Sequence, residues 1–244
     1  MDWVVDAGNT HLRWAGARGG RILWQAALPD AGPKALTAAW SCAPPPARIV
    51  VATVAGPRTR ETIARAARDS GQREPEFLVS PAAGWEVRNG YREPANLGID
   101  RFAALVAARH RHPAGALVVD VGTAVTLDLL VGGEHRGGYI LPGPALMGEA
   151  LTTGTAGVAA AQPDPAEAPG RDTATGVGRG IAHALVGAVA EVRAHLAGQG
   201  LSGVPCILTG GGAALVAQRI APPRIQLPGL VLEGLARMAA EPMD

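Results

Sequence analysis

Cysteine is scarce in this sequence, which excludes the structural classes that depend on it. The 244 residues include two cysteines, Cys42 and Cys206, in unrelated contexts. Two isolated cysteines make neither a metal-ligand spacing nor a disulfide framework. We therefore expect a protein of a reducing compartment, the cytoplasm.

Net charge and long apolar runs are missing as well. The 22 Lys and Arg residues nearly balance the 21 Asp and Glu residues. Such a balance gives no basic field that would attract nucleic acid or an anionic membrane. No apolar run reaches the roughly 18 residues of a membrane helix, and no basic signal-peptide segment precedes the first apolar run. We expect no nucleic-acid partner and no membrane partner.

What the sequence does have is enough apolar residues for a packed core, at 48% of the chain against 18% charged. Their spacing predicts an α/β protein that opens with a β-meander. The expected strands are 3–5, 11–15, 21–24, 48–54, 77–79, 116–119, 125–130 and 206–208. The expected helices are 58–70, 100–111, 144–152, 173–198 and two short ones at the C-terminus, with loops at 80–97 and 162–171.

One pattern occurs twice. An apolar run, an Asp-x-Gly-Asn-Thr or Asp-x-Gly-Thr turn and an alternating strand are found at 3–15 and again at 116–130. An internal repeat of this length predicts two related halves, 1–113 and 114–244, each beginning with a β-hairpin.

The first hairpin turn carries groups that suit phosphate. Gly8 has no Cβ to block the close approach of an oxygen to main-chain N–H groups, and Asn9 and Thr10 add side-chain donors. Asp6 suits a hydrated Mg²⁺ ion, and Arg13 on the outgoing strand could meet phosphate charge. An ordinary hairpin turn is the alternative, because Asp, Gly and Asn all favour turns.

The second hairpin turn offers the same chemistry. Thr123 and the neighbouring amides suit phosphate contacts, and two facing hairpins would form a phosphate clamp. Asp120 ends a buried strand and would be costly there without a cation or hydrogen-bond donors. We expect a structural role for Asp128, further along the same strand pair.

A third segment, 89–101, ends in Gly98-Ile99-Asp100-Arg101 at the start of a predicted helix. A carboxylate that accepts a hydroxyl proton and a guanidinium that holds an anionic substrate are what phosphorylation of an alcohol needs. A plain helix cap is the alternative for Asp100.

Two glycine-rich segments are less informative. We interpret Gly137–Pro144 as a glycine-bracketed strand and turn before a helix. It could form a wall of the cleft, but we favour a tight structural connection. Thr209–Ala213 follows a strand and opens a helix, so its amides could face a nucleotide, but such turns are common in α/β proteins.

Together these motifs resemble type III pantothenate kinases along nearly the whole chain. The motifs that carry the resemblance are Asp6-x-Gly8-Asn9-Thr10, Gly98-Ile99-Asp100-Arg101, Asp120-x-Gly122-Thr123-Ala124-x-Thr126-x-Asp128, Gly137-Gly138-x-Ile140-x-Pro142-Gly143 and 230–235.

The resemblance implies an actin-like ATPase fold: two ribonuclease-H-like halves with mixed sheets and an active-site cleft between them. It implies that ATP phosphorylates pantothenate at its primary hydroxyl, the first step of coenzyme A biosynthesis, with Mg²⁺ and a monovalent cation, K⁺ or NH₄⁺. Asp100 would be the general base, and Asp120 would hold the monovalent cation. ATP phosphates would be bound by Asp6, Ala7, Gly8, Asn9, Thr10, His11, Leu12, Arg13 and Thr123. Pantothenate would be bound by Tyr91, Gly98, Ile99, Asp100, Arg101 and Thr173.

The resemblance also implies a homodimer in which Thr173 reaches the substrate of the partner subunit. Asp172 stands where the family usually has Asn or Ser, so nearby Thr175 is the alternative for this contact.

Two other functions fit parts of the pattern. Another sugar or small-acid kinase on the same fold would use the same hairpins, because fold does not fix the substrate. A non-catalytic relative that assists transcription is the other. It is disfavoured because Asp6 and Asp100 are both present and because no DNA-reading helix is recognisable.

Overall fold

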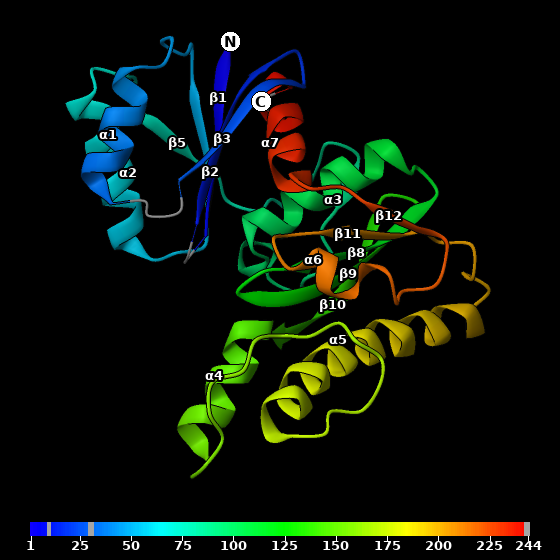
Figure 1. Ribbon diagram of the computed structural model, residues 1–244. Coiled ribbons are helices and arrows are strands. Elements are labelled where there is room, and N and C mark those ends of the chain that lie inside the picture. The colour runs from blue at the N-terminus through cyan, green and yellow to red at the C-terminus, as the bar shows by residue number, and fades with distance from the viewer. Residues whose placement is uncertain (9–10, 29–31, 242–244) are drawn as a thin grey trace. The chain divides into compact units, whose positions relative to one another are not determined.

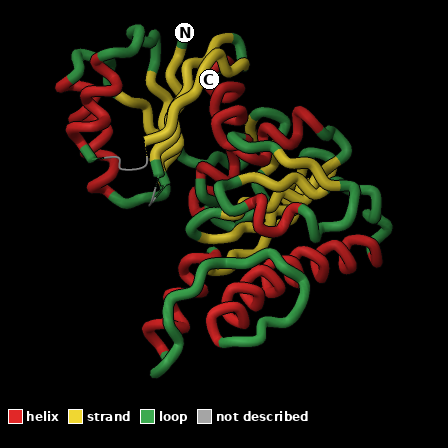
Figure 2. Tube along the Cα trace, viewed as in Figure 1, coloured by secondary structure: helices red, strands yellow, loops and turns green. Residues whose placement is uncertain are grey.

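The computed structural model describes residues 1–8, 11–28 and 32–241, and these form two compact units. The first unit contains 1–113, 132–136 and 229–244, and the second contains 114–131 and 137–228. Figure 1 labels the elements of both units, and Figure 2 shows the strands of each unit gathered into a sheet with helices on its faces.

The first unit is built on a five-stranded mixed sheet in the order β3-β2-β1-β4-β5. The first three strands are antiparallel neighbours, whereas β4 is parallel to β1 and β5 is parallel to β4. The strands are β1 (Asp2–Ala7), β2 (Leu12–Arg18), β3 (Arg21–Leu28), β4 (Ile49–Thr53) and β5 (Pro75–Phe77).

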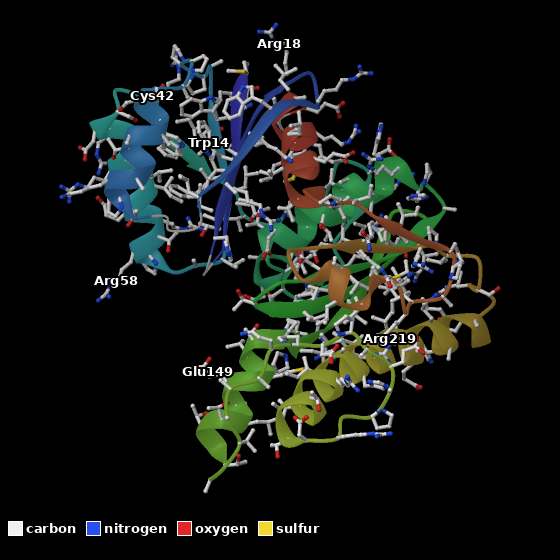
Figure 3. The ribbon with its side chains drawn as sticks, viewed as in Figure 1. Trp14, Arg18, Cys42, Arg58, Glu149 and Arg219 are labelled. Carbon is white, nitrogen blue, oxygen red and sulfur yellow. The ribbon has the colours of Figure 1, made fainter. Side chains whose placement is uncertain are left out.

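Helices α1 (Pro33–Ser41) and α2 (Pro57–Asp69) cover one face of this sheet. Alternate residues of β1 point toward them, since side chains on a strand leave opposite faces in turn. Trp3 therefore packs with Trp14 of β2 and Trp40 of α1 in one buried cluster. The Trp3 and Trp14 rings meet edge to face, 4.8 Å apart. Figure 3 shows Trp14 between the sheet and these helices.

The other face is covered by α7 (Leu230–Ala240), which packs on β1 and on α3 (Ile99–Arg111). Gly234 makes the approach of α7 to α3 possible, because a Cβ there would overlap the Ala103 carbonyl oxygen. Between β5 and α3 the chain forms two short strands and a 3₁₀ turn. These are β6 (Ala83–Gly84), β7 (Val87–Arg88) and η1 (Pro94–Asn96).

The second unit has a mixed sheet in the order β12-β11-β8-β9-β10. β8 is antiparallel to β9 and parallel to β11, which is parallel to β12. β10 begins in the first unit, where Glu134 pairs with Arg88 of β7. The strands are β8 (Gly115–Val121), β9 (Ala124–Val131), β10 (Glu134–Pro142), β11 (Cys206–Thr209) and β12 (Arg224–Gln226).

The core of the second unit lies where α5 (Thr173–Gly198) packs on β8, β9 and β11. The helix α6 (Ala213–Ala217) adds to this core, and α4 (Pro144–Gly154) packs on α5. Both cysteines are free; Cys206 lies in this core, and burial raises the pKa of its thiol to about 11.

The two sheets share one plan. β1 and β8 each have an antiparallel neighbour that follows directly in the sequence and a parallel neighbour that comes later. The order β3-β2-β1-β4-β5 matches β10-β9-β8-β11-β12 strand for strand. The predicted α/β class with mixed sheets is confirmed, and the repeated sequence pattern corresponds to this repeated topology.

Some predicted elements need correction. A helix at 33–41 and the short strands β6, β7 and β12 were not predicted, and β5 spans 75–77 instead of 77–79. The compact units divide at 113/114, but 132–136 and 229–244 group with the first unit. Whether the predicted halves 1–113 and 114–244 act as domains stays a prediction.

Candidate active site

The first hairpin places Asp6 and Arg13 directly opposite each other. They are cross-strand partners of β1 and β2, so both side chains leave the same face of the sheet. Both are half-buried, and the Gly8 N–H donates to the His11 carbonyl at 3.1 Å across the turn. A carboxylate and a guanidinium therefore stand together where β1 ends.

The remaining residues of this hairpin differ in what they can offer a ligand. Ala7 and Leu12 are buried, with about 1% of their surface exposed, so only their main chain could contact a phosphate. His11 is exposed. Asn9 and Thr10, predicted as side-chain donors, lie outside the described residues.

Packing does not explain the glycine at position 8. A Cβ there would have the His11 carbonyl oxygen as its nearest neighbour, at an ordinary 3.6 Å. The protein itself thus has room for a side chain at Gly8, and the close approach of a ligand remains the predicted reason for glycine.

The second hairpin places Asp120 in β8 where Asp6 stands in β1, one residue before the end of the strand. Its cross-strand partners are Thr126 of β9 and Thr209 of β11. The turn beyond it is formed by Gly122 and Thr123, both exposed. Asp120 thus has neighbours with oxygen-bearing side chains on both adjacent strands.

Gly143 packs directly on this turn. Its N–H donates to the Thr123 carbonyl at 2.9 Å, and a Cβ on Gly143 would overlap the carbonyl oxygens of Gly122 and Thr123. The segment that we interpreted as a structural connection therefore supports the predicted phosphate turn.

The glycine turn after β11 packs on the same hairpin. The Gly212 N–H donates to the Val121 carbonyl at 2.8 Å. Gly210 has φ +88°, and a Cβ there would overlap Asp120 Oδ1. Such turns are common in α/β proteins, but here the glycines allow the turn to lie against Asp120.

The third segment forms the first turn of α3. The N-cap is Gly98, and Asp100 is the second helical residue, so Asp100 is not the N-cap residue itself. Asp100 Oδ1 accepts the Arg101 N–H at 2.8 Å. A Cβ on Gly98 would overlap that oxygen and lie 3.3 Å from Val54 Cγ1. The Ile99 side chain is buried, so it could contact a ligand only through its main chain.

Arg101 is held against Tyr91. Only 9% of Arg101 is exposed; its Nη1 donates to Tyr91 Oη at 2.7 Å, and its guanidinium carbon lies 5.4 Å from the centre of the Tyr91 ring. Asn89 fixes the backbone before this ring by accepting the Tyr91 N–H at 3.0 Å and donating to the Pro81 and Pro94 carbonyls. The structure thus brings together two residues that were predicted to bind one substrate.

The start of α5 is capped by Asp172, whose Oδ1 accepts the Thr175 N–H at 2.9 Å. This hydrogen bond from the Thr175 main chain is the main reason why the pKa of Asp172 lies below its usual value. The Thr175 hydroxyl donates to the Asp172 carbonyl at 3.3 Å, whereas Thr173 is the exposed first residue of the helix. Thr175 is therefore engaged in capping.

No cluster of three or more His, Cys, Asp or Glu side chains suited to a metal occurs in the described parts of the chain. Single carboxylates at Asp6 and Asp120 still fit hard cations, since Mg²⁺ keeps most of its waters and K⁺ takes oxygen ligands. Within 1–8, 11–28 and 32–241, none of the helices has the length and apolar character needed to cross a membrane.

Comparison with solved structures identifies the same overall fold. A candidate Baf family transcriptional activator from Campylobacter jejuni superposes with a TM-score of 0.63 at 18% identity, covering 97% of this chain and 96% of that one. A candidate 2-dehydro-3-deoxygalactonokinase from Sinorhizobium meliloti gives 0.59 at 16% identity and covers 100% of both chains. With the two equivalent sheets, this likeness confirms a fold of two ribonuclease-H-like halves.

Sequence comparison identifies the family. The family model described as type III pantothenate kinase matches residues 3–195. The type III pantothenate kinase of Halorhodospira halophila is 37% identical over 244 residues, covering 96% of each chain. That of Aromatoleum aromaticum is 38% identical over 242 residues, covering 99% of this chain and 98% of the relative. The chain belongs to the type III pantothenate kinase family.

Proposed function

We propose that this protein transfers the γ-phosphoryl group of ATP to the primary hydroxyl of pantothenate. The product, 4′-phosphopantothenate, is the first intermediate of coenzyme A biosynthesis. Membership of the family along nearly the whole chain is the observation that carries this proposal.

The acceptor end of the reaction is assigned to the start of α3. Asp100 accepts the hydroxyl proton as the new oxygen–phosphorus bond forms and the bond to the leaving ADP oxygen breaks. Arg101, positioned by Tyr91, binds the pantothenate carboxylate, and Gly98 and Ile99 contribute main-chain contacts. Because phosphoryl transfer passes through a loose transition state, holding the hydroxyl in line matters more than the strength of the base.

The donor end is assigned to the two hairpins. Residues 6–13 and Thr123 bind the ATP phosphates through main-chain N–H groups and hydroxyls, and Arg13 offsets phosphate charge. The room for a Cβ at Gly8 supports this assignment, because the protein's own packing does not require glycine there.

Two cations complete the proposed site. Asp6 would hold Mg²⁺ through bound water, and Asp120, between Thr126 and Thr209, would hold the monovalent cation, K⁺ or NH₄⁺. Both ions would neutralise the phosphate charge that builds up during transfer. The protein's own part is to supply oxygen ligands at fixed positions on rigid strands.

We further propose a homodimer in which Thr173 contacts the pantothenate bound by the partner. Large apolar side chains on β10 and α4 of the second unit are exposed, which supports an interface there. They are Tyr139, Ile140, Leu146 and Leu151, all between 40% and 60% exposed.

A direct test is ADP formation by the purified protein with pantothenate and Mg-ATP, run in Na⁺, K⁺ and NH₄⁺ salts. We expect pantothenate-dependent turnover that is faster in K⁺ or NH₄⁺ than in Na⁺. A panel of sugars and small hydroxy acids serves as the comparison. Turnover with a panel member and none with pantothenate would show that the kinase has another substrate.

A further inference from the structure

His135 is a buried residue that the proposed chemistry has not used. It lies near the start of β10, within the first unit, and only 2% of it is exposed. Its imidazole stacks on the Tyr91 ring, with the ring centres 5.8 Å apart and the planes 20° from parallel. Tyr91 in turn receives the hydrogen bond from Arg101 Nη1 at 2.7 Å. His135, Tyr91 and Arg101 therefore form one continuous set of contacts.

The backbone around His135 is held in place. The preceding residue, Glu134, pairs with Arg88 of β7, and the Arg88 N–H donates to the Gly133 carbonyl at 2.8 Å. Gly133 has φ +86°, and a Cβ there would lie 2.6 Å from the Glu86 carbonyl oxygen, so the close approach requires glycine. The imidazole is thus presented to Tyr91 from a strand position with little freedom to move.

Tyr91 itself is only half-buried and sits in a loop, so its ring needs support to stay in one orientation. Asn89 fixes its main chain by accepting the Tyr91 N–H at 3.0 Å. The ring is oriented by the His135 imidazole, which stacks on it, and by the Arg101 guanidinium, which lies over it. Without the imidazole, the Tyr91 ring could rotate away, and the Arg101 guanidinium would lose the hydrogen-bond partner that fixes its orientation.

We infer that His135 is a positioning residue for the anionic substrate: it orients Tyr91, and through Tyr91 it orients the guanidinium of Arg101. This inference rests on the proposed function, since Arg101 is taken to bind the pantothenate carboxylate. The competing explanation is that His135 merely fills the core.

The test compares His135→Leu, which removes the stacked ring, with His135→Phe, which keeps a flat ring in the same place. We expect H135L to raise the KM for pantothenate roughly three- to tenfold, which is the worth of an aromatic contact, and to leave the KM for ATP unchanged. H135F should stay close to the wild type. H135N, which keeps a polar side chain in the buried position, replaces H135L if the leucine variant does not fold. His110→Leu, at an exposed position of α3, is the matched control.

A second comparison asks whether the effect passes through Tyr91. In a Tyr91→Leu background, replacing His135 by Leu should add no further increase in the KM for pantothenate. An equal loss in both backgrounds, or equal changes in the KM for ATP and for pantothenate, would overturn the inference while pantothenate turnover stands. Absence of pantothenate turnover in the wild type would overturn the proposed function and this inference with it.

Discussion

Asp100 and Gly98 show how closely the residues at the start of α3 depend on each other. Gly98 leaves space into which the Asp100 carboxylate reaches, and the same carboxylate accepts the next main-chain N–H. The geometry therefore holds one carboxylate oxygen in a defined place at a helix N-terminus.

The role of Asp100 as base can be tested with Asp100→Asn. The amide keeps the size and the hydrogen-bond acceptor but cannot take a proton. We expect kcat to fall by at least about a hundredfold, the usual contribution of a general base, with no change in the melting temperature. Asp69→Asn at the exposed end of α2 is the control. Near-wild-type turnover by a folded D100N protein would contradict the assignment.

Gly8 and Gly143 are expected to respond in opposite ways to alanine. Gly8→Ala has room in the protein, so stability should be unchanged, while the KM for ATP rises roughly tenfold or more because the phosphates are displaced. Gly143→Ala forces a Cβ onto the carbonyl oxygens of the Gly122–Thr123 turn and should lower stability by about 1–3 kcal/mol. Thermal unfolding and ATP titrations measure the two effects. If G8A binds ATP normally, the first hairpin is an ordinary turn.

At this scale, the sequence predicts local motifs well and long-range contacts poorly. The Asp-Gly-Thr turns and the Gly98–Arg101 segment are short and carry their chemistry in adjacent residues. Gly143 and Gly210 matter because of backbone that is distant in the sequence, and His135 because of a ring brought to it by strand pairing. None of these three contacts can be predicted from the residues that are adjacent in the sequence.

Among the elements, α5 depends on Asp172 for its beginning. The ionised carboxylate accepts the Thr175 N–H, which lowers the pKa of Asp172 in the folded protein. A lowered pKa means that the stabilisation is present at neutral pH and is lost as the pH falls below about 4.

The cap can be tested with Asp172→Ala and Asp172→Asn. We expect D172A to melt at a lower temperature than the wild type at pH 7, and D172N, which keeps an acceptor but not the charge, to melt between the two. The difference between wild type and D172A should stay constant down to about pH 4 and shrink as the solution is acidified below that value. Melting curves at a series of pH values measure this. A constant difference across the series would show that the charge of Asp172 plays no part.

α1 and the hairpin of β6 and β7, which the sequence did not predict, are stabilised by tertiary contacts. α1 buries Leu36 and Trp40 and packs Ala39 against the core, too few large apolar residues to make a strong helical pattern in an Ala-rich stretch. The hairpin of β6 and β7 turns through Trp85 and Glu86 at φ +48° and +60°, which neither residue type favours. Trp85 is held there by donating to the Glu241 carbonyl at 2.7 Å.

At the scale of the whole molecule, the sequence predicts the internal repeat, but it does not predict in which unit α7 packs. Both hairpins follow an apolar run and turn through an Asp-x-Gly motif, so the sequence predicts two related halves, and the structure has two sheets with equivalent strand order. α7 follows the second repeat in the sequence, yet it packs in the first unit, where Gly234 allows its backbone to lie against the α3 backbone at Ala103. Such a close contact depends on how the two helix surfaces fit together, and it leaves no periodic pattern in the sequence.

The proposed dimer can be tested by combining two inactive variants. If Thr173 completes the partner's site, Asp100→Asn and Thr173→Arg disable different sites within a mixed dimer. One site then carries both changes and the other carries neither. Each variant alone should be inactive, since one lacks the base and the other blocks the substrate with a long side chain.

Equal amounts of the two variants, mixed after partial unfolding and refolded together, should recover about a quarter of the wild-type activity, because half of the dimers are mixed and each has one intact site. Light scattering confirms the dimer, and a mixture of D100N with Asp69→Asn,Asp100→Asn is the inactive control. No recovery from a mixture shown to contain mixed dimers would mean that Thr173 acts within its own subunit or not at all. Recovery can arise only if residues of two chains meet at one substrate, because neither variant supplies a complete site by itself.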